Sequence, residues 1–124
     1  MTKLAPTPNK RFTPKLGIHI LSYMRIVKRR VLQEFGERHP QARSSLDHWY
    51  QLIKKAKWQN TADVKRVFGV SVDFVTNNRA VFNIKGNNYR LIAEINYRSQ
   101  AVYVRFLGTH AEYEKVDANS VKLN

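Results

Sequence analysis

Hydrophobic and polar positions alternate along the second half of the chain with the two-residue period of β-strands. The pattern predicts strands at residues 70–75, 80–84, 89–96 and 101–107, separated by turn-forming residues. In the last strand, alternation predicts one face with Val102, Val104 and Phe106, and another with Tyr103, Arg105 and Leu107. The strand before it separates Leu91, Ala93 and Ile95 from Arg90, Ile92 and Glu94. The sheet is therefore expected to have one apolar face and one face that carries arginines.

The first half of the domain has helical spacing. A short apolar strand at 24–27 precedes a stripe of Val31, Leu32 and Phe35, and this helix should stop near Pro40. A second helix, at 41–56, has an apolar face made by Leu46, Trp49, Tyr50 and Ile53. Asn60 or Thr61 can cap a third helix at 62–67. The order predicts an α+β fold: an N-terminal strand, a helical hairpin, then an antiparallel sheet of about four strands.

The 124 residues suffice for one domain with a core but not for two. Residues 1–23 hold three prolines, four Lys/Arg and no acidic residue, a composition that predicts a flexible basic extension. The domain itself should then span 24–124. No run of about 18 apolar residues occurs, so neither a membrane-spanning helix nor a membrane partner is expected.

The chain is strongly basic: 22 Lys+Arg against 9 Asp+Glu give a formal charge of +13. Such a charge favours nucleic acid as a partner, then an acidic protein, then an anionic membrane surface. The alternative is that the charge indicates no particular partner, because many small bacterial proteins are basic. Cysteine is absent, which excludes disulfides, thiolate metal sites and cysteine nucleophiles. This fits a reducing compartment, and we expect a cytoplasmic protein.

The sequence has no phosphate-binding P-loop, no serine-nucleophile elbow and no zinc-protease motif. Its four histidines lack the spacing of metal ligands, so no metal or cofactor is expected. An enzyme with this inventory would use Lys, Arg, His and Tyr. These residues suit RNA cleavage by the substrate's own 2′-hydroxyl, which needs alignment, cations, a base and an acid.

Five residues are the candidates for that chemistry. Arg90 and Lys85 lie on or beside the polar face of the sheet, and Arg105 can reach the same region from the next strand. His110 and Tyr113, three residues apart on a turn or short helix, would project together.

The segment RAVFNIKGNNYRLIAEINYRSQAVYVRFLGTHAEYEKVD, residues 79–117, resembles the HigB toxin family, a branch of the RelE/ParE superfamily of bacterial toxins. Its most specific parts are FNIKGNNYRLIA and YVRFLGTHAEYEKVD, and the resemblance runs from 24 to about 117. It implies a RelE-like fold and cleavage of mRNA, commonly in ribosome-bound messages. It also implies a HigA-like antitoxin with a helix-turn-helix domain.

The resemblance also implies roles by position. Arg90 is similar to the strand arginine that holds the scissile phosphate, and Lys85 to a strand lysine. Asn83 stands where some relatives carry a second lysine, which leaves lysine-based proton transfer in question. His110 matches the acid for the 5′-oxygen, and Tyr113 the aromatic that orients a base or the 2′-hydroxyl. Lys115 is a weaker substitute.

Each role has a structural alternative. Arg90 or Arg105 can pair with Glu94, His110 can cap a helix, and Lys85 can be a turn residue. Trp49, Tyr50 and Trp58 resemble a base-stacking set, but their helical spacing favours packing. The remaining cations are expected on helix surfaces, in contact with RNA of the ribosome or an acidic antitoxin segment; they are Lys28, Arg29, Arg30, Lys54 and Lys55.

The sequence and the family resemblance thus predict a metal-independent, ribosome-dependent mRNA endonuclease that acts as the toxin of a toxin–antitoxin pair. Two other functions stay open. The ParE branch of the superfamily poisons DNA gyrase without cutting RNA, and a non-catalytic RNA-binding protein would use the same basic surface.

Overall fold

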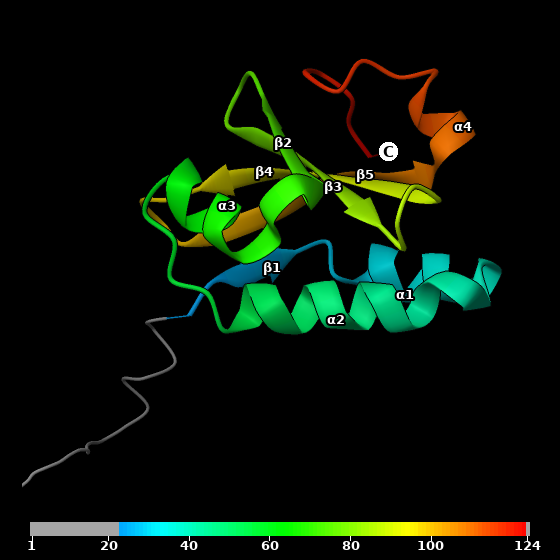
Figure 1. The fold of residues 1–124 in the computed structure, drawn as a ribbon, viewed down its shortest axis with the longest axis horizontal. Helices are drawn as coiled ribbons and strands as arrows, with labels where there is room; N and C mark the ends of the chain where they lie inside the picture. The colour runs from blue at the N-terminus through cyan, green and yellow to red at the C-terminus, as the bar shows by residue number, and fades with distance from the viewer. Residues whose placement is uncertain (1–22, 124) are drawn as a thin grey trace, which may run out of the picture.

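The computed structural model describes residues 23–123 and has the α+β fold expected from the sequence (Figure 1). Three helices precede most of the sheet: α1 (Arg30–Arg38), α2 (Arg43–Lys54) and α3 (Thr61–Phe68). The strands are β1 (Arg25–Val27), β2 (Val72–Val75), β3 (Arg79–Ile84), β4 (Tyr89–Asn96) and β5 (Ala101–Thr109). A short helix follows them, α4 (His110–Tyr113). Residues 1–22 of the expected extension lie outside the described range, and within that range no helix is long and apolar enough to cross a membrane.

The helix boundaries have identifiable local causes. Pro40 begins a short 3-10 turn, Pro40–Ala42, so α2 starts at Arg43, two residues later than expected. Asn60 is the N-cap of α3, and its side chain accepts a hydrogen bond from the amide of Asp63, as its position suggested. A second 3-10 turn, Gly69–Ser71, delays β2 to Val72.

All five strands form one sheet in the order β1-β5-β4-β3-β2. The last four strands are antiparallel in sequence order, as expected, while β1 runs parallel to β5. The sheet is therefore mixed. Asn83 pairs with Arg90 across β3 and β4, and Arg90 pairs with Gly108 across β4 and β5.

The predicted alternation in β5 is correct up to Val104 and wrong beyond it. A register shift lies at Ile92/Ala93, because Ile92 pairs with Phe106 and Ala93 with Val104. Arg105 is thus an extra residue, and such a bulge reverses the side-chain alternation that follows. Phe106 moves to the face of Ile92, and Leu107 packs against the core instead.

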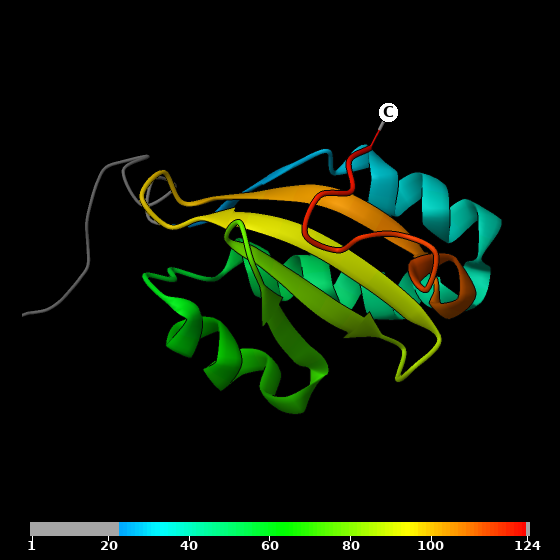
Figure 2. The same cartoon turned by 90° about the horizontal axis from the view of Figure 1, so that it is seen from above.

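The two faces of the sheet are covered differently. The helix-side face packs on α1, α2 and α3, and its core includes Phe35, Trp49, Trp58 and Phe82. The burial of Trp49 and Trp58 confirms that these rings pack rather than stack on bases. The outer face carries Arg79, Val81, Arg90, Ile92 and Glu94. Within residues 23–123 no helix lies over its centre; instead the C-terminal segment, residues 114–123, runs across β4 and β5 (Figures 1 and 2).

Candidate active site

Arg90 lies on the outer face of β4 with only 8% of its surface exposed. Its guanidinium donates hydrogen bonds to the backbone oxygens of Asn87 (3.3 Å) and Tyr89 (3.2 Å), and to the side-chain oxygen of Asn87. These bonds use at most three of the five N–H donors of an arginine, so at least two remain. The part played by Asn87 was not predictable from the sequence, since an asparagine in this position usually only shapes a turn.

Tyr113, at the end of α4, contacts the same guanidinium. The central carbon of the Arg90 group lies 5.6 Å from the centre of the Tyr113 ring, within the range of a cation–π contact. The ring of Phe106 lies 6.5 Å from that of Tyr113, centre to centre. Arg90, Tyr113 and Phe106 thus form one cluster on the outer face of the sheet. Phe106 belongs to it because the bulge in β5 turns its side chain toward that face.

Helix α4 is fixed at its beginning by a capping box. Thr109 accepts a hydrogen bond from the amide of Glu112, and the Glu112 carboxylate accepts one from the amide of Thr109. The amide of His110 donates to the oxygen of Asn88 (3.0 Å). Asn87 holds the Arg90 side chain and Asn88 holds the backbone of His110. The turn between β3 and β4 therefore connects Arg90 and His110. The Thr-x-x-Glu pattern was a readable signal for this helix start that the sequence interpretation missed.

His110 is the first residue of α4, and its side chain is 45% exposed. Its Nε2 lies 3.8 Å from a carboxylate oxygen of Glu114, while its Nδ1 is buried without a hydrogen-bond partner. Within residues 23–123 no hydrogen bond or ion pair joins His110 to Arg90. Their shared link is the Asn87–Asn88 turn and the α4 helix that carries Tyr113.

Gly108 is the position where β5 passes closest to this cluster. A Cβ added there would lie 2.7 Å from Cζ of Phe106 and 2.8 Å from the carboxylate of Glu112. Gly108 is also the cross-strand partner of Arg90. Only glycine lets the capping box, the Phe106 ring and Arg90 occupy their places together.

Lys85 lies in the turn after β3 rather than on a strand. Its backbone is left-handed, with φ of 53°, and its side chain is exposed. Its backbone oxygen accepts a hydrogen bond from the amide of Asn88 (3.2 Å), so the turn begins at this residue. Asn83 is instead the direct strand neighbour of Arg90.

Arg105 is engaged elsewhere on the outer face. Its Nε donates to the carboxylate of Glu94 (3.2 Å), and its guanidinium lies over the ring of Tyr103. Glu94 follows Arg90 by four residues on β4, which corresponds to about 13 Å along a strand. The structure therefore brings together Arg90 and Tyr113, with His110 on the same short helix, but places Arg105 in a separate cluster.

Two of the surface cations meet on one ring. Arg29, which precedes α1, and Lys54, which ends α2, lie 4.6 Å and 5.4 Å from the centre of the Tyr50 ring. The other cations of this set are exposed near them in the chain: Lys28 and Arg30 beside Arg29, and Lys55 beside Lys54. Lys115 is also exposed, but it follows α4 and so lies near the candidate active site rather than near Tyr50.

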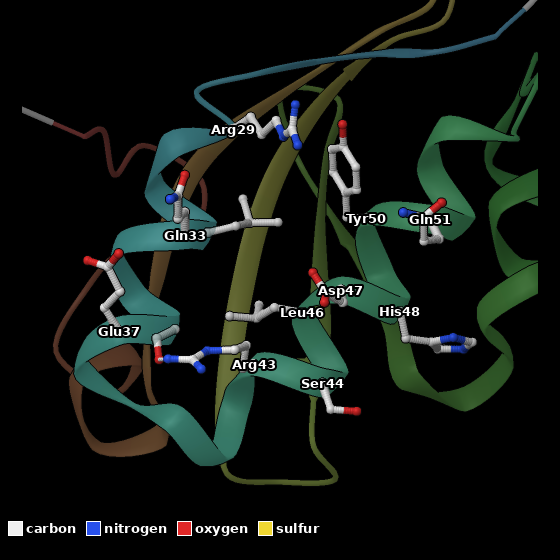
Figure 3. A pocket seen from close by; sticks show the side chains of 12 residues that line it. Arg29, Gln33, Glu37, Arg43, Ser44, Leu46, Asp47, His48, Tyr50 and Gln51 are labelled. Atoms are coloured by element: carbon white, nitrogen blue, oxygen red, sulfur yellow. Dashed lines mark hydrogen bonds between the residues drawn. The ribbon is translucent and has the colours of Figure 1, made fainter.

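A groove of about 900 Å³ separates α1 and α2 (Figure 3). Its lining includes Leu32 of α1 and Leu46 of α2. Arg29 and Tyr50 lie at one end of the groove (Figure 3). None of the five candidates for the chemistry lines this groove. In the described part of the chain, no group of three His, Asp or Glu residues is placed to hold a metal ion.

Comparison with known families matches residues 42–116 to a family described as HigB_toxin, the RelE-like toxic component of a toxin–antitoxin system. The chain belongs to the HigB toxin family. The matched span contains all five candidates for the chemistry and Lys115, whereas Lys28, Arg29 and Arg30 precede it. Membership confirms the RelE-like interpretation of the fold and implies an antitoxin partner for this HigB-family toxin.

Individual relatives extend the similarity. The chain is 28% identical over 94 residues to a protein named mRNA interferase HigB from Escherichia coli O6:H1, covering 75% of this chain and 91% of that protein. It is 29% identical over 92 residues to the mRNA interferase toxin HigB of Escherichia coli K12, covering 73% and 88%. A Shigella flexneri protein named mRNA interferase HigB gives the same values.

Proposed function

We propose that this HigB-family toxin is an mRNA endonuclease that cuts translated messages on the ribosome by attack of the 2′-hydroxyl on the scissile phosphate. The observation that carries the proposal is the Arg90 guanidinium, fixed by Asn87 and placed against Tyr113 on a helix that also carries His110. The names of the similar proteins, which are mRNA interferases, support the choice of RNA as substrate.

The reaction needs little covalent chemistry from the protein. The 2′-hydroxyl gives its proton to a base and its oxygen attacks phosphorus, while the bond to the 5′-oxygen breaks and that oxygen takes a proton from an acid. The products are a 2′,3′-cyclic phosphate and a 5′-hydroxyl. Arg90 binds the non-bridging phosphate oxygens with its free N–H donors, where charge accumulates in the transition state. No metal ion is required, because the nucleophile belongs to the substrate.

His110 is the proposed acid for the leaving 5′-oxygen. Its Nε2 side is partly exposed next to Glu114, so an incoming nucleotide can reach it. The Tyr113 hydroxyl orients the 2′-hydroxyl or the base, since its ring is already fixed by Arg90 and Phe106. Geometry of this kind contributes to rate by restricting the reacting groups to a productive arrangement.

Lys85, Arg105 and Lys115 are proposed as supporting cations. Lys85 extends from the turn that precedes Arg90, and Lys115 follows α4, so both border the same end of the sheet. Arg105 must leave Glu94 before it can contact RNA, because its Nε is bound to that carboxylate. We therefore assign it the smallest contribution of the five candidates for the chemistry.

The cations near Tyr50 suit the RNA of the ribosome. No ion pair involves Arg25, Lys28, Arg29, Arg30, Lys54, Lys55 or Lys57 in residues 23–123. Unpaired cations gain most from a phosphate backbone, because binding releases its counterions. The proposed protein partner is a HigA-like antitoxin with a helix-turn-helix domain that neutralises the toxin.

The test compares cleavage of a translated message by the wild type, Arg90→Ala and His110→Ala, on purified ribosomes. Each variant should lose about 10²–10⁴-fold in rate if it removes the phosphate contact or the acid. Arg66→Ala is the matched control, because Arg66 is an exposed arginine in an ion pair on α3. Undiminished rates in the first two variants would contradict the assigned roles. In cells that express the wild type, broken DNA without cut mRNA would favour a gyrase poison.

A further inference from the structure

Arg79, at the start of β3, is a buried arginine that the proposed reaction does not use. Only 5% of it is exposed, and its NH1 group donates hydrogen bonds to the backbone oxygens of Ala118 (3.1 Å) and Val121 (2.7 Å). Its Nε lies 3.7 Å from the carboxylate of Glu94 and has no hydrogen bond. Burial of a guanidinium is costly unless its donors are used. Here the NH1 group is used on the C-terminal segment, and Nε faces the carboxylate of Glu94.

The neighbouring hairpin holds the same stretch of chain. In the turn between β2 and β3, the amide of Thr76 donates to the side-chain oxygen of Asn119 (2.9 Å). The side-chain amide of Asn77 donates to the backbone oxygen of Asn119 (2.9 Å). The turn between β2 and β3 therefore holds the C-terminal segment at Asn119. Arg79, at the start of β3, holds the same segment on either side of Asn119, at Ala118 and at Val121.

The attached residues are continuous with α4. The amide of Glu114 donates to the oxygen of His110 (3.1 Å), and the amide of Val116 donates to that of Tyr113 (3.2 Å). A helix of four residues is not stable on its own, because its few hydrogen bonds do not offset the free-energy cost of helix nucleation. Its beginning is held by the capping box, and its end leads directly into the stretch that Arg79 holds (Figures 1 and 2).

We propose that Arg79 is a positioning residue for the active site. By fixing residues 118 and 121 against the sheet, it sets the orientation in which α4 presents His110 and Tyr113 to Arg90. The proposal rests on the proposed nuclease function for its kinetic consequence, but the attachment itself is independent of any activity. Arg79 touches neither the phosphate nor the reacting oxygens in this account.

Arg79→Met tests the proposal, because methionine fills similar space and donates no hydrogen bond. A displaced catalytic group lowers kcat while leaving RNA binding intact, so kcat should fall about 10–100-fold with KM within about two-fold of wild type. Amide hydrogen exchange should accelerate at Glu114, Val116 and Val121. Arg66→Met is the control, since it removes an ion-paired arginine from α3 and should change neither quantity.

Asn119→Ala is a second variant that removes the two hydrogen bonds from Thr76 to the same segment without opening the buried arginine site. It should reproduce the fall in kcat and the faster exchange, and it keeps the test decisive if Arg79→Met does not fold. An unchanged kcat together with faster exchange, or unchanged exchange in both variants, would overturn the positioning role. If the wild type cleaves no RNA, the proposed function fails. The comparison of amide exchange rates between wild type and variants then still tests whether Arg79 holds the C-terminal segment in place.

Discussion

The guanidinium of Arg90 lies over the ring of Tyr113, with 5.6 Å between its central carbon and the ring centre. The two residues come from different elements, a sheet strand and a one-turn helix, and lie 23 positions apart in the sequence. Their contact ties the proposed phosphate-binding group to the helix that supplies the proposed acid. Substitution of either Arg90 or Tyr113 should therefore disturb both the phosphate-binding group and the position of helix α4.

Tyr113 offers a way to separate packing from chemistry. Tyr113→Phe keeps the ring over Arg90 but removes the hydroxyl, so cleavage should fall about ten-fold or more with little change in thermal stability. Tyr113→Ala removes both the ring and the hydroxyl, and should lower activity and stability together. The measurement is single-turnover cleavage beside a thermal melt. Equal cleavage by wild type and Tyr113→Phe would show that the hydroxyl has no part in the reaction.

Gly108 should tolerate no side chain. In Gly108→Ala the new Cβ would meet Phe106 at 2.7 Å, so either the ring or β5 must move. Such overpacking typically costs about 1–3 kcal/mol of unfolding free energy. Activity should fall further than stability explains, because the shift falls on the strand partner of Arg90. Denaturant unfolding and cleavage assays check this, with Gly36→Ala as the control, because a Cβ at Gly36 would come no closer than 3.7 Å to its nearest neighbour. A fully active, equally stable Gly108→Ala would contradict the close approach.

Acid should loosen the C-terminal segment. The pKa of Asp117 is lowered from its ordinary value, first by the hydrogen bond from the amide of Asn119 and then by that from the hydroxyl of Ser120. A carboxyl with a lowered folded-state pKa stabilises the fold above its unfolded pKa. That contribution disappears as pH falls through the folded value, below about pH 4. The amide resonance of Asn119 should report this loss, and Asp117→Asn should abolish it. A pH-independent Asn119 signal in the wild type would argue against the assignment.

The cations around Tyr50 should contribute to RNA or ribosome binding through charge. Arg29→Gln with Lys54→Gln removes two cations from one ring. If both contact phosphates, the slope of log affinity against log salt should fall by about 1.4, since each single-stranded phosphate contact contributes about 0.7. Binding measured between about 50 and 200 mM salt tests this. Arg66→Gln with Arg98→Gln is the control for equal charge loss, and an equal change in slope would deny any special role to the Tyr50 surface.

Much of the fold was readable from the sequence because periodicity and turn chemistry agreed. The predicted strand at 89–96 has the observed bounds, and the third helix was predicted with Asn60 as one of two candidate caps. The bulge at Arg105 was not foreseen, because an extra residue leaves no mark in the alternation of a strand rich in apolar residues. For that reason Phe106 and Leu107 were assigned to the wrong faces.

The candidate site was recoverable only in part. Arg90, His110 and Tyr113 were singled out from residue type and family resemblance, and the structure places two of them in contact and the third on the same helix. The supporting residues were missed, because their roles depend on tertiary position. Asn87 reads as a turn residue, and Arg79 reads as a solvated strand end until the C-terminal segment folds over it.

The chemical form of the RNA ends tests the central claim most directly. A message cut by the wild-type protein during translation on purified ribosomes, with both new ends mapped at nucleotide resolution, distinguishes the possible reactions. Attack by the internal hydroxyl predicts a 2′,3′-cyclic phosphate on one fragment and a 5′-hydroxyl on the other. A 3′-hydroxyl paired with a 5′-phosphate, or the absence of any new end, would contradict the account.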